Sequence, residues 1–171
     1  MNYSLVNNRT QLPMILDLGC GDEKFEGSIA LDLRRTRSVD IVADAHKLPF
    51  RDNSFDYVFS SHLIEHFSHR ETESILREWI RILKHGGTIE IRCPDLRARA
   101  LLFFLNPSWQ NVRNIYGEQD YEGNQHRCGF AFKNLKSLLE ACGISNVKRI
   151  KKGYKGLPFI PDCLNVMGKK K

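Results

Sequence analysis

Short apolar runs alternate with polar, glycine-containing turns through the first half of the chain. The runs are rich in β-branched and aromatic residues and bounded by turn residues, which predicts buried strands of a parallel sheet; they lie at Met14–Leu18, Ile29–Leu33, Val39–Val42, Phe55–Ser60 and Thr88–Cys93. Only about ten residues join the first two runs, near the lower limit for a helical crossover. We therefore expect the first helices to be reduced to about a turn.

Apolar residues recur at helical spacing further along the chain. This spacing predicts helices from about Glu71 to Lys84, ended by Gly86-Gly87, from about Leu96 to Leu105, stopped by Asn106-Pro107, and from Ala131 to Cys142, capped by Gly143. The stretch Trp109–Gly129 is predicted to be irregular, and Val147–Ile150 and Leu164–Met167 to be the final strands.

This order of elements predicts an α/β fold with a Rossmann-like, doubly wound sheet. We expect the sheet to be mostly parallel, with an antiparallel C-terminal strand and shortened N-terminal helices. The length of 171 residues suggests one domain. Within residues 1–171 we expect a cofactor half at about 14–94 and a substrate or lid half at about 95–171.

The charge distribution and the cysteine spacing limit which partners and which cellular location we expect. The net charge is +6, and much of it lies near the end, in Lys148-Arg149, Lys151-Lys152, Lys155 and Lys169–Lys171. Such a surface is either plainly solvated or a site for an anionic partner. The five cysteines have no CxxC spacing, and Met1–Gln11 lacks an apolar segment. We therefore expect no disulfide framework, signal peptide or membrane partner, and a cytoplasmic location.

The most informative stretch is Ile15–Asp22, which ends an apolar run in an acidic residue and a glycine turn. Gly19 and Gly21 remove Cβ atoms where a ligand must lie against the backbone. Asp32, at the end of the next run, is placed to accept hydrogen bonds from the two hydroxyls of a ribose. This arrangement follows the logic of nucleotide-binding α/β folds.

Six motifs in order resemble those of a class I S-adenosylmethionine-dependent methyltransferase, type 11-like small-molecule branch. They are Asp17-Leu-Gly-Cys-Gly21, Asp32, Ala43–Phe50, Ser54–Val58, His62–His66 and Leu83–Gly87. The resemblance covers about Met14 to Pro94. Family members commonly continue the glycine turn as GxGxG into a full helix. Here Asp22–Gly27 follows instead, so we expect the helix N-terminus that faces the methionine carboxylate to be frayed or missing, which lowers cofactor affinity.

The resemblance implies S-adenosylmethionine as cofactor and a role for each matching residue. Asp17 and Gly19 would hold the methionine amino group, and the turn through Cys20 and Gly21 would approach the carboxylate. Asp32, with Leu33 beside it, would bind the ribose, Asp44 the adenine amine and the Ala45 N–H the adenine ring. Each acidic residue has a local alternative, as a turn or cap. The side chains beside the methionine end, near the transferable methyl, would be Ser60, Ser61 and His62.

The stretch His62-x-x-Glu65-His66 also matches the HxxEH signature of a zinc metalloprotease. That chemistry needs both histidines on one helical face and a further ligand. The motif directly follows a predicted strand and fits the methyltransferase pattern, so we expect no metal. The alternatives for this segment are a plain helix start and a role facing substrate or cofactor.

The segment Tyr116–Phe130 is dense in amides, aromatics and glycines between two predicted helices. Long irregular loops of this kind are usually functional, and its place in the chain puts it over the acceptor side. His126 is the first candidate for a general base because its ordinary pKa lies near neutrality; His62, Asp120 and Tyr121 follow. A structural lid, with His126 bonded to backbone, is the alternative.

These observations lead to one expected function and two alternatives. We expect a methyltransferase acting on oxygen or nitrogen of a small-molecule or sugar-like acceptor. An RNA-directed methyltransferase is favoured by the basic C-terminal third. A non-catalytic cofactor-binding subunit with a protein partner, or an oligomer, is favoured by the trimmed helices.

Overall fold

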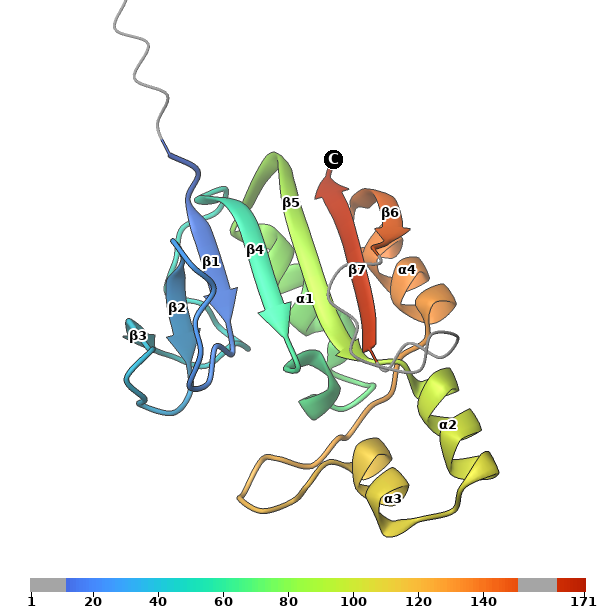
Figure 1. Ribbon diagram of the computed structural model, residues 1–171. Helices are drawn as coiled ribbons and strands as arrows, with labels where there is room; N and C mark the ends of the chain where they lie inside the picture. The colour runs from blue at the N-terminus through green and yellow to red at the C-terminus, as the bar shows by residue number, and fades with distance from the viewer. Residues whose placement is uncertain (1–11, 151–162) are drawn as a thin grey trace, which may run out of the picture.

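The computed structural model describes residues 12–150 and 163–171; the predicted absence of a leader at Met1–Gln11 and the cations Lys151, Lys152 and Lys155 lie outside them. The core is a seven-stranded sheet in the order β3-β2-β1-β4-β5-β7-β6 (Figure 1). The strands are β1 (Ile15–Leu18), β2 (Ile29–Asp32), β3 (Ile41–Val42), β4 (Phe55–Ser61), β5 (Leu83–Pro94), β6 (Ile144–Arg149) and β7 (Cys163–Lys170).

Strands β1 to β5 pair in parallel, and β7 runs antiparallel to both β5 and β6. The mostly parallel sheet with an antiparallel C-terminal strand is therefore confirmed. Its central strands carry apolar side chains that are fully buried, such as Leu16, Val58 and Ile91. This burial follows from their position in the middle of the sheet.

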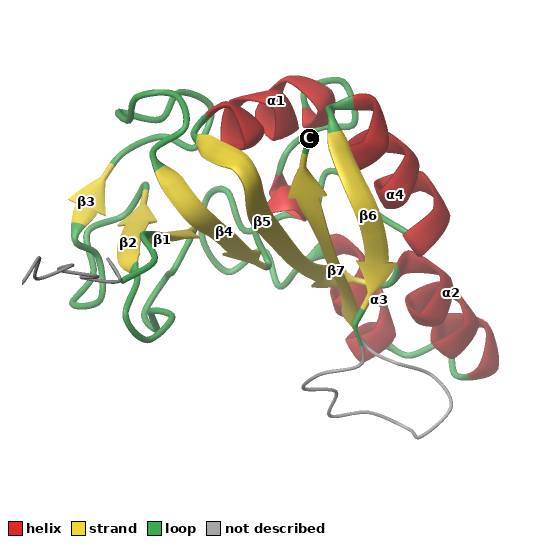
Figure 2. Cartoon of the chain, turned by 90° about the horizontal axis from the view of Figure 1, so that it is seen from above, coloured by secondary structure: helices red, strands yellow, loops and turns green. Residues whose placement is uncertain are grey.

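Helices α1 (Thr72–Arg81) and α4 (Phe132–Ala141) lie on the same face of the sheet (Figure 2). Helices α2 (Leu96–Leu105) and α3 (Trp109–Tyr116) lie beyond one end of it, and the short 3-10 helix η1 (Ile64–His66) follows β4. Among the described residues the β1–β2 and β2–β3 connections contain turns and no helix. The expected shortening of the first helices is confirmed.

The predicted end of α1 is wrong. The helix stops at Arg81, and Gly86-Gly87 lies inside β5 instead of terminating the helix. The chain can leave the helix early because backbone N–H groups from Asn53 to Phe55 take the carbonyls of Arg81 and Ile82 at 2.7–3.1 Å. The glycines then occupy a bulge in the β4–β5 pairing, where Gly86 has a φ of +74°.

The predicted irregular stretch Trp109–Gly129 is wrong over its first part, which forms α3. Ser108 caps this helix, since its hydroxyl accepts a hydrogen bond from the Asn111 N–H at 3.3 Å. Gly117 ends it with a φ of +86°. The remaining segment, residues 117–131, passes beneath the carboxyl ends of the parallel strands in Figure 1, and is called the covering loop below.

Candidate functional site

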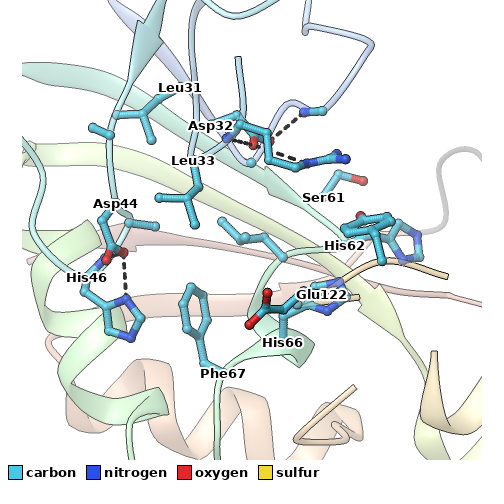
Figure 3. A pocket seen from close by; sticks show the side chains of 18 of the residues that line it. Leu31, Asp32, Leu33, Asp44, His46, Ser61, His62, His66, Phe67 and Glu122 are labelled. Carbon is cyan, nitrogen blue, oxygen red and sulfur yellow. Dashed lines mark hydrogen bonds and ion pairs between the residues drawn. The ribbon is translucent and has the colours of Figure 1, made fainter. Parts of the chain in front are cut away.

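A cavity of about 500 Å³ opens at the carboxyl ends of β1, β2 and β4 (Figure 3). Its volume falls in the range typical of small-molecule sites. Eight of the eleven residues predicted to contact the cofactor line it: Gly19, Gly21, Asp32, Leu33, Asp44, Ala45, Ser61 and His62. The site therefore lies where ligands bind in open α/β sheets.

The glycine turn after β1 needs its two glycines for different reasons. Gly19 has a φ of +70°, and a Cβ there would lie 2.9 Å from the Leu63 side chain. Gly21 has a φ of +58°, and apart from Gly21 itself and its two chain neighbours no atom of the described residues lies within 4 Å of the point that a Cβ would occupy. Gly19 thus permits close packing of the turn against the segment after β4, whereas Gly21 leaves open space facing the cavity.

Asp32 is held in place through both carboxylate oxygens. Oδ2 accepts a hydrogen bond from the Gly21 N–H at 2.9 Å, and Oδ1 accepts one from the Arg34 N–H at 2.8 Å. Each oxygen keeps a further lone pair. A fixed carboxylate with free acceptor capacity at the cavity wall suits a pair of ligand hydroxyls.

Asp44 caps its own loop as well as facing the cavity. Its Oδ1 accepts from the His46 N–H at 2.9 Å and lies 2.6 Å from His46 Nδ1, and the backbone hydrogen bond is the main cause of the lowered pKa of Asp44. Oδ2 is left for a ligand. The hydrophobic core holds this loop in place, because the buried Trp79 donates its indole N–H to the Ala45 carbonyl at 3.1 Å.

A second cavity of about 330 Å³ adjoins the first, sharing Gly19 and Ser61 with it. Asp17 and Cys20 line it. Asp17 accepts the Phe25 N–H at 2.8 Å but is only 2% exposed, and this burial raises the pKa of its carboxyl. Burial likewise raises the pKa of the Cys20 thiol to about 11. Asp17 is thus a buried acid that gains from a cationic ligand group.

Ser60 and Ser61, at the end of β4, and His62, just after it, are placed differently. Ser60 is fully buried and lines neither cavity, while Ser61, its neighbour on the opposite face of the strand, lines both. His62 lines the larger cavity with a left-handed φ of +54°. Its Nε2 lies 3.6 Å from Cys163 Sγ and its Nδ1 lies 3.1 Å from Glu65 Oε1, and these two partners raise the pKa of His62 to about 10.

The covering loop closes the cavity from the other side. Its Tyr121, Glu122, Gly123 and Arg127 line the cavity, and the Arg34 guanidinium stacks over the Tyr121 ring at 4.5 Å. The Arg127 and Cys128 N–H groups donate to the Glu65 carbonyl at 2.8 and 3.0 Å. The loop is therefore attached to η1 at its base and to the end of β2 at its tip.

Of the other candidates for a catalytic base, Tyr121 lines the larger cavity, whereas His126 and Asp120 do not. His126 is half-buried behind it, with Nδ1 3.1 Å from the Ile115 carbonyl oxygen, and burial lowers its pKa. Asp120 is exposed and accepts from the Asn124 side chain at 2.5 Å. His126 lies instead beside Glu65 and His66.

Sequence reasoning missed several cavity residues: Arg34, His46, Phe67, Glu122 and Arg127. Arg34 could have been found, since it lies two residues beyond Asp32, just after the end of β2. His46 could have been found as the partner that an Asx turn at Asp44 requires. The three others depend on how η1 and the covering loop pack, for which the sequence carries no local signal.

The basic C-terminal third is partly committed to internal contacts. Arg149 pairs with Asp95 at 2.8 Å, and Lys170 donates to the Leu83 carbonyl at 2.7 Å. Lys148 is exposed. In the part of the chain that the structure describes, no helix is long and apolar enough to cross a membrane.

Comparison with known proteins gives a consistent picture. Residues 24–91 match the Methyltransf_11 family model, described as a methyltransferase domain. "Probable tRNA methyltransferase 9B" of Homo sapiens is 27% identical over 138 residues, which covers 68% of this chain and 30% of that protein. The ubiquinone/menaquinone biosynthesis C-methyltransferase of Pseudomonas savastanoi pv. phaseolicola is 43% identical over 77 residues, which covers 44% and 29%. The chain thus spans less than a third of these relatives' lengths.

Among solved structures, a Thermotoga maritima protein described as an S-adenosylmethionine-dependent methyltransferase, possible histamine N-methyltransferase, superposes with a TM-score of 0.66. It is 20% identical, and the match covers 94% of this chain and 84% of that one. This likeness shows the fold. Together the matches confirm the resemblance to class I S-adenosylmethionine-dependent methyltransferases of type 11.

Proposed function

We propose that this chain, which has the fold of the S-adenosylmethionine-dependent methyltransferases, binds S-adenosylmethionine in the 500 Å³ cavity and methylates a small-molecule or sugar-like acceptor on oxygen or nitrogen. The observation that carries the proposal is the convergence of Gly21, Asp32 and Asp44 on one cavity at the carboxyl ends of the strands. The acceptor class goes beyond the comparisons, since the relatives' names include both a tRNA and a quinone-pathway methyltransferase.

The residues present fit this cofactor. Asp32 holds the ribose, with Leu33 beside it, while Asp44 Oδ2 and the Ala45 N–H hold the adenine. The open space at Gly21 receives the methionine carboxylate, for which no helix N-terminus is available in the β1–β2 connection. The buried Asp17 and the Gly19–Cys20 turn hold the amino group, because a cation beside Asp17 offsets the burial of its carboxylate.

When bound, S-adenosylmethionine supplies an activated methyl group on a sulfonium with a neutral leaving group. The task of the chain is therefore mainly to align the acceptor with that methyl. Ser61 and His62 line the cavity and are proposed to flank the methyl group of the bound cofactor. With a pKa of about 10, His62 is an imidazolium at neutral pH. It acts as a positioning cation and not as a base, and a base is needed only for a weakly nucleophilic acceptor.

A polar small molecule is the acceptor that the cavity wall favours. Glu122, Arg127 and His66 lie on the side of the covering loop, and offer both donors and acceptors to a hydroxyl- or amine-bearing compound. An RNA acceptor needs exposed cations; at the C-terminal end Arg149 and Lys170 contact internal partners, whereas Lys148, Lys169 and Lys171 are exposed. RNA and a non-catalytic role remain as outcomes of the experiment.

The experiment offers the protein and S-adenosylmethionine either a pool of polar metabolites or a pool of cellular RNA. Mass spectrometry then identifies products heavier by one CH₂ unit. The proposal predicts products in the metabolite pool that are lost in Glu122→Gln and kept in Glu118→Gln, an exposed neighbour outside the cavity. Methylated nucleotides in RNA, or cofactor binding without product in either pool, would contradict it.

A further inference from the structure

Three metal-ligating side chains meet behind the cavity, although they come from two separate segments. Glu65 and His66 belong to η1, and His126 belongs to the covering loop. One potential ligand atom from each lies within 4.8 Å of those of the other two. The His66 and His126 ring centres are 5.3 Å apart. The packing of the covering loop on η1 thus creates a two-histidine, one-carboxylate cluster.

Glu65 is the unusual member of this cluster. Its side chain is 2% exposed. Oε1 lies 3.1 Å from His62 Nδ1, but Oε2 has no hydrogen-bond partner among the described residues. A buried carboxylate oxygen without a partner is costly. A cation at this oxygen removes that cost.

Both imidazoles are oriented as metal-binding histidines are. His66 Nδ1 lies 3.1 Å from the Gln125 carbonyl oxygen, and His126 Nδ1 lies 3.1 Å from the Ile115 carbonyl oxygen. These contacts place the ring proton on Nδ1 and leave the Nε2 lone pair free, which is the usual outer-shell arrangement around a metal.

We propose that Glu65, His66 and His126 bind one divalent transition metal ion, with zinc the best match. Two imidazoles and a carboxylate suit zinc or cobalt and are a poor set for magnesium or calcium. Ligand bonds of about 2.0–2.1 Å place tetrahedral ligand atoms roughly 3.4 Å apart, so the three side chains, whose ligand atoms now lie within 4.8 Å of one another, must move closer to bind an ion.

The fourth coordination position is expected on the cavity side, because His66 lines the cavity. If the proposed methyl transfer is correct, a metal there would hold an acceptor hydroxyl and lower its pKa. Only this role rests on the proposed function; metal binding does not. The sequence predicts no metal at all, so this proposal departs from that expectation. The structure engages His62 with Glu65 and Cys163, and brings His126 into the cluster.

The test is a titration of the metal-free full chain with Co²⁺, followed by visible absorption and by metal analysis after desalting. The proposal predicts one equivalent of cobalt with tetrahedral absorption bands, displaced by Zn²⁺. Affinity should fall at least tenfold in Glu65→Gln and in His126→Asn. It should not change in His85→Ala, an exposed histidine near the start of β5, or in Cys163→Ser.

Two results would overturn the proposal. One is the absence of stoichiometric cobalt binding by folded wild-type protein. The other is binding that survives both Glu65→Gln and His126→Asn but is lost in Cys163→Ser, which would place the ion at the His62–Cys163 pair. If Glu65→Gln does not fold, His66→Gln on the cavity wall gives the same discrimination. Because the cobalt spectrum needs no methyl donor, its failure is distinct from failure of the proposed methyl transfer.

Discussion

The Gly21 N–H donates a hydrogen bond to the Asp32 carboxylate at 2.9 Å, which links the turn after β1 to the end of the neighbouring strand β2. This contact makes Asp32, the proposed ribose ligand, also the anchor of the glycine turn. Replacing Asp32 by Ala removes an acceptor for the ribose hydroxyls and releases the turn. We predict a loss of about 1.5–3 kcal/mol in binding of S-adenosylhomocysteine, a roughly 10- to 150-fold weaker affinity by calorimetry.

The matched control is Asp22→Ala, an exposed acid one residue beyond the turn. It carries the same charge change but does not line the larger cavity. Equal losses of affinity in the two variants would mean that Asp32 acts only through the net field, and would remove it from the site.

Substitutions at the two glycines of the turn distinguish the cost of a steric clash from the cost of a strained backbone. In Gly19→Ala the new methyl meets Leu63 at 2.9 Å in addition to the cost of a positive φ. Gly21→Ala bears only the backbone cost, about 1–2 kcal/mol. We predict that urea unfolding ranks Gly19→Ala as the less stable variant by at least about 1 kcal/mol.

Gly27→Ala controls for backbone strain, since it has a φ of +75° with open space around its Cβ position and does not line either cavity. It should match Gly21→Ala in stability but keep wild-type affinity for the cofactor product. A Gly21→Ala variant that also keeps full affinity would show that the methionine end does not approach this turn.

Trp79 links the core to the adenine side of the site. Its indole N–H bonds the Ala45 carbonyl, and its side chain is fully buried. Trp79→Phe leaves that carbonyl without its donor and removes packing, so we predict a loss of about 2 kcal/mol in unfolding free energy together with weaker cofactor binding. Trp109→Phe, at a site 81% exposed, should change stability by less than about 0.5 kcal/mol.

At neutral pH the ionised Asp17 carboxylate is expected to lower the stability of the fold while strengthening the binding of S-adenosylmethionine. Because burial raises its folded-state pKa above the ordinary 3.8, the ionised carboxyl disfavours folding once the pH exceeds that value. Asp17→Asn retains an acceptor for the Phe25 N–H. It should therefore be as stable as wild type near pH 4 and more stable at neutral pH, while binding S-adenosylmethionine more weakly.

Denaturant titrations at both pH values, with Asp22→Asn as the control, measure this difference. A stability gap between Asp17→Asn and wild type that closes as the pH rises would contradict the sign of the argument.

Much of the fold could be predicted from the sequence because its determinants are local. The apolar runs ending in Asp17 and Asp32 define buried parallel strands, and a connection of about ten residues leaves no room for a helix. Local patterns misled where tertiary contacts decide. The backbone around Asn53–Phe55 ends α1 before its periodicity does, so that Gly86-Gly87 serves a strand bulge.

The residues proposed to bind the cofactor could be predicted from the sequence, whereas those proposed to face the acceptor could be predicted only in part. The difference again lies between local signals and tertiary contacts. Asp32 and Asp44 follow strand ends whose positions the sheet fixes. His126 was singled out by its chemistry, but its surroundings depend on the covering loop bonding to the Glu65 carbonyl through Arg127 and Cys128. No pattern in either segment signals that contact. The sequence therefore indicated the residue without the cluster in which it lies.

We have proposed that the cavity at the carboxyl ends of β1, β2 and β4 holds S-adenosylmethionine. Calorimetric titration of the wild-type chain with S-adenosylhomocysteine, the product that keeps the adenosine and methionine contacts without the methyl, tests it most directly. We predict saturable binding of one molecule per chain, weakened in Asp32→Ala and unchanged in Asp22→Ala. Folded wild-type protein that gives no saturable binding heat, and shows no rise in melting temperature with the same compound, would contradict it.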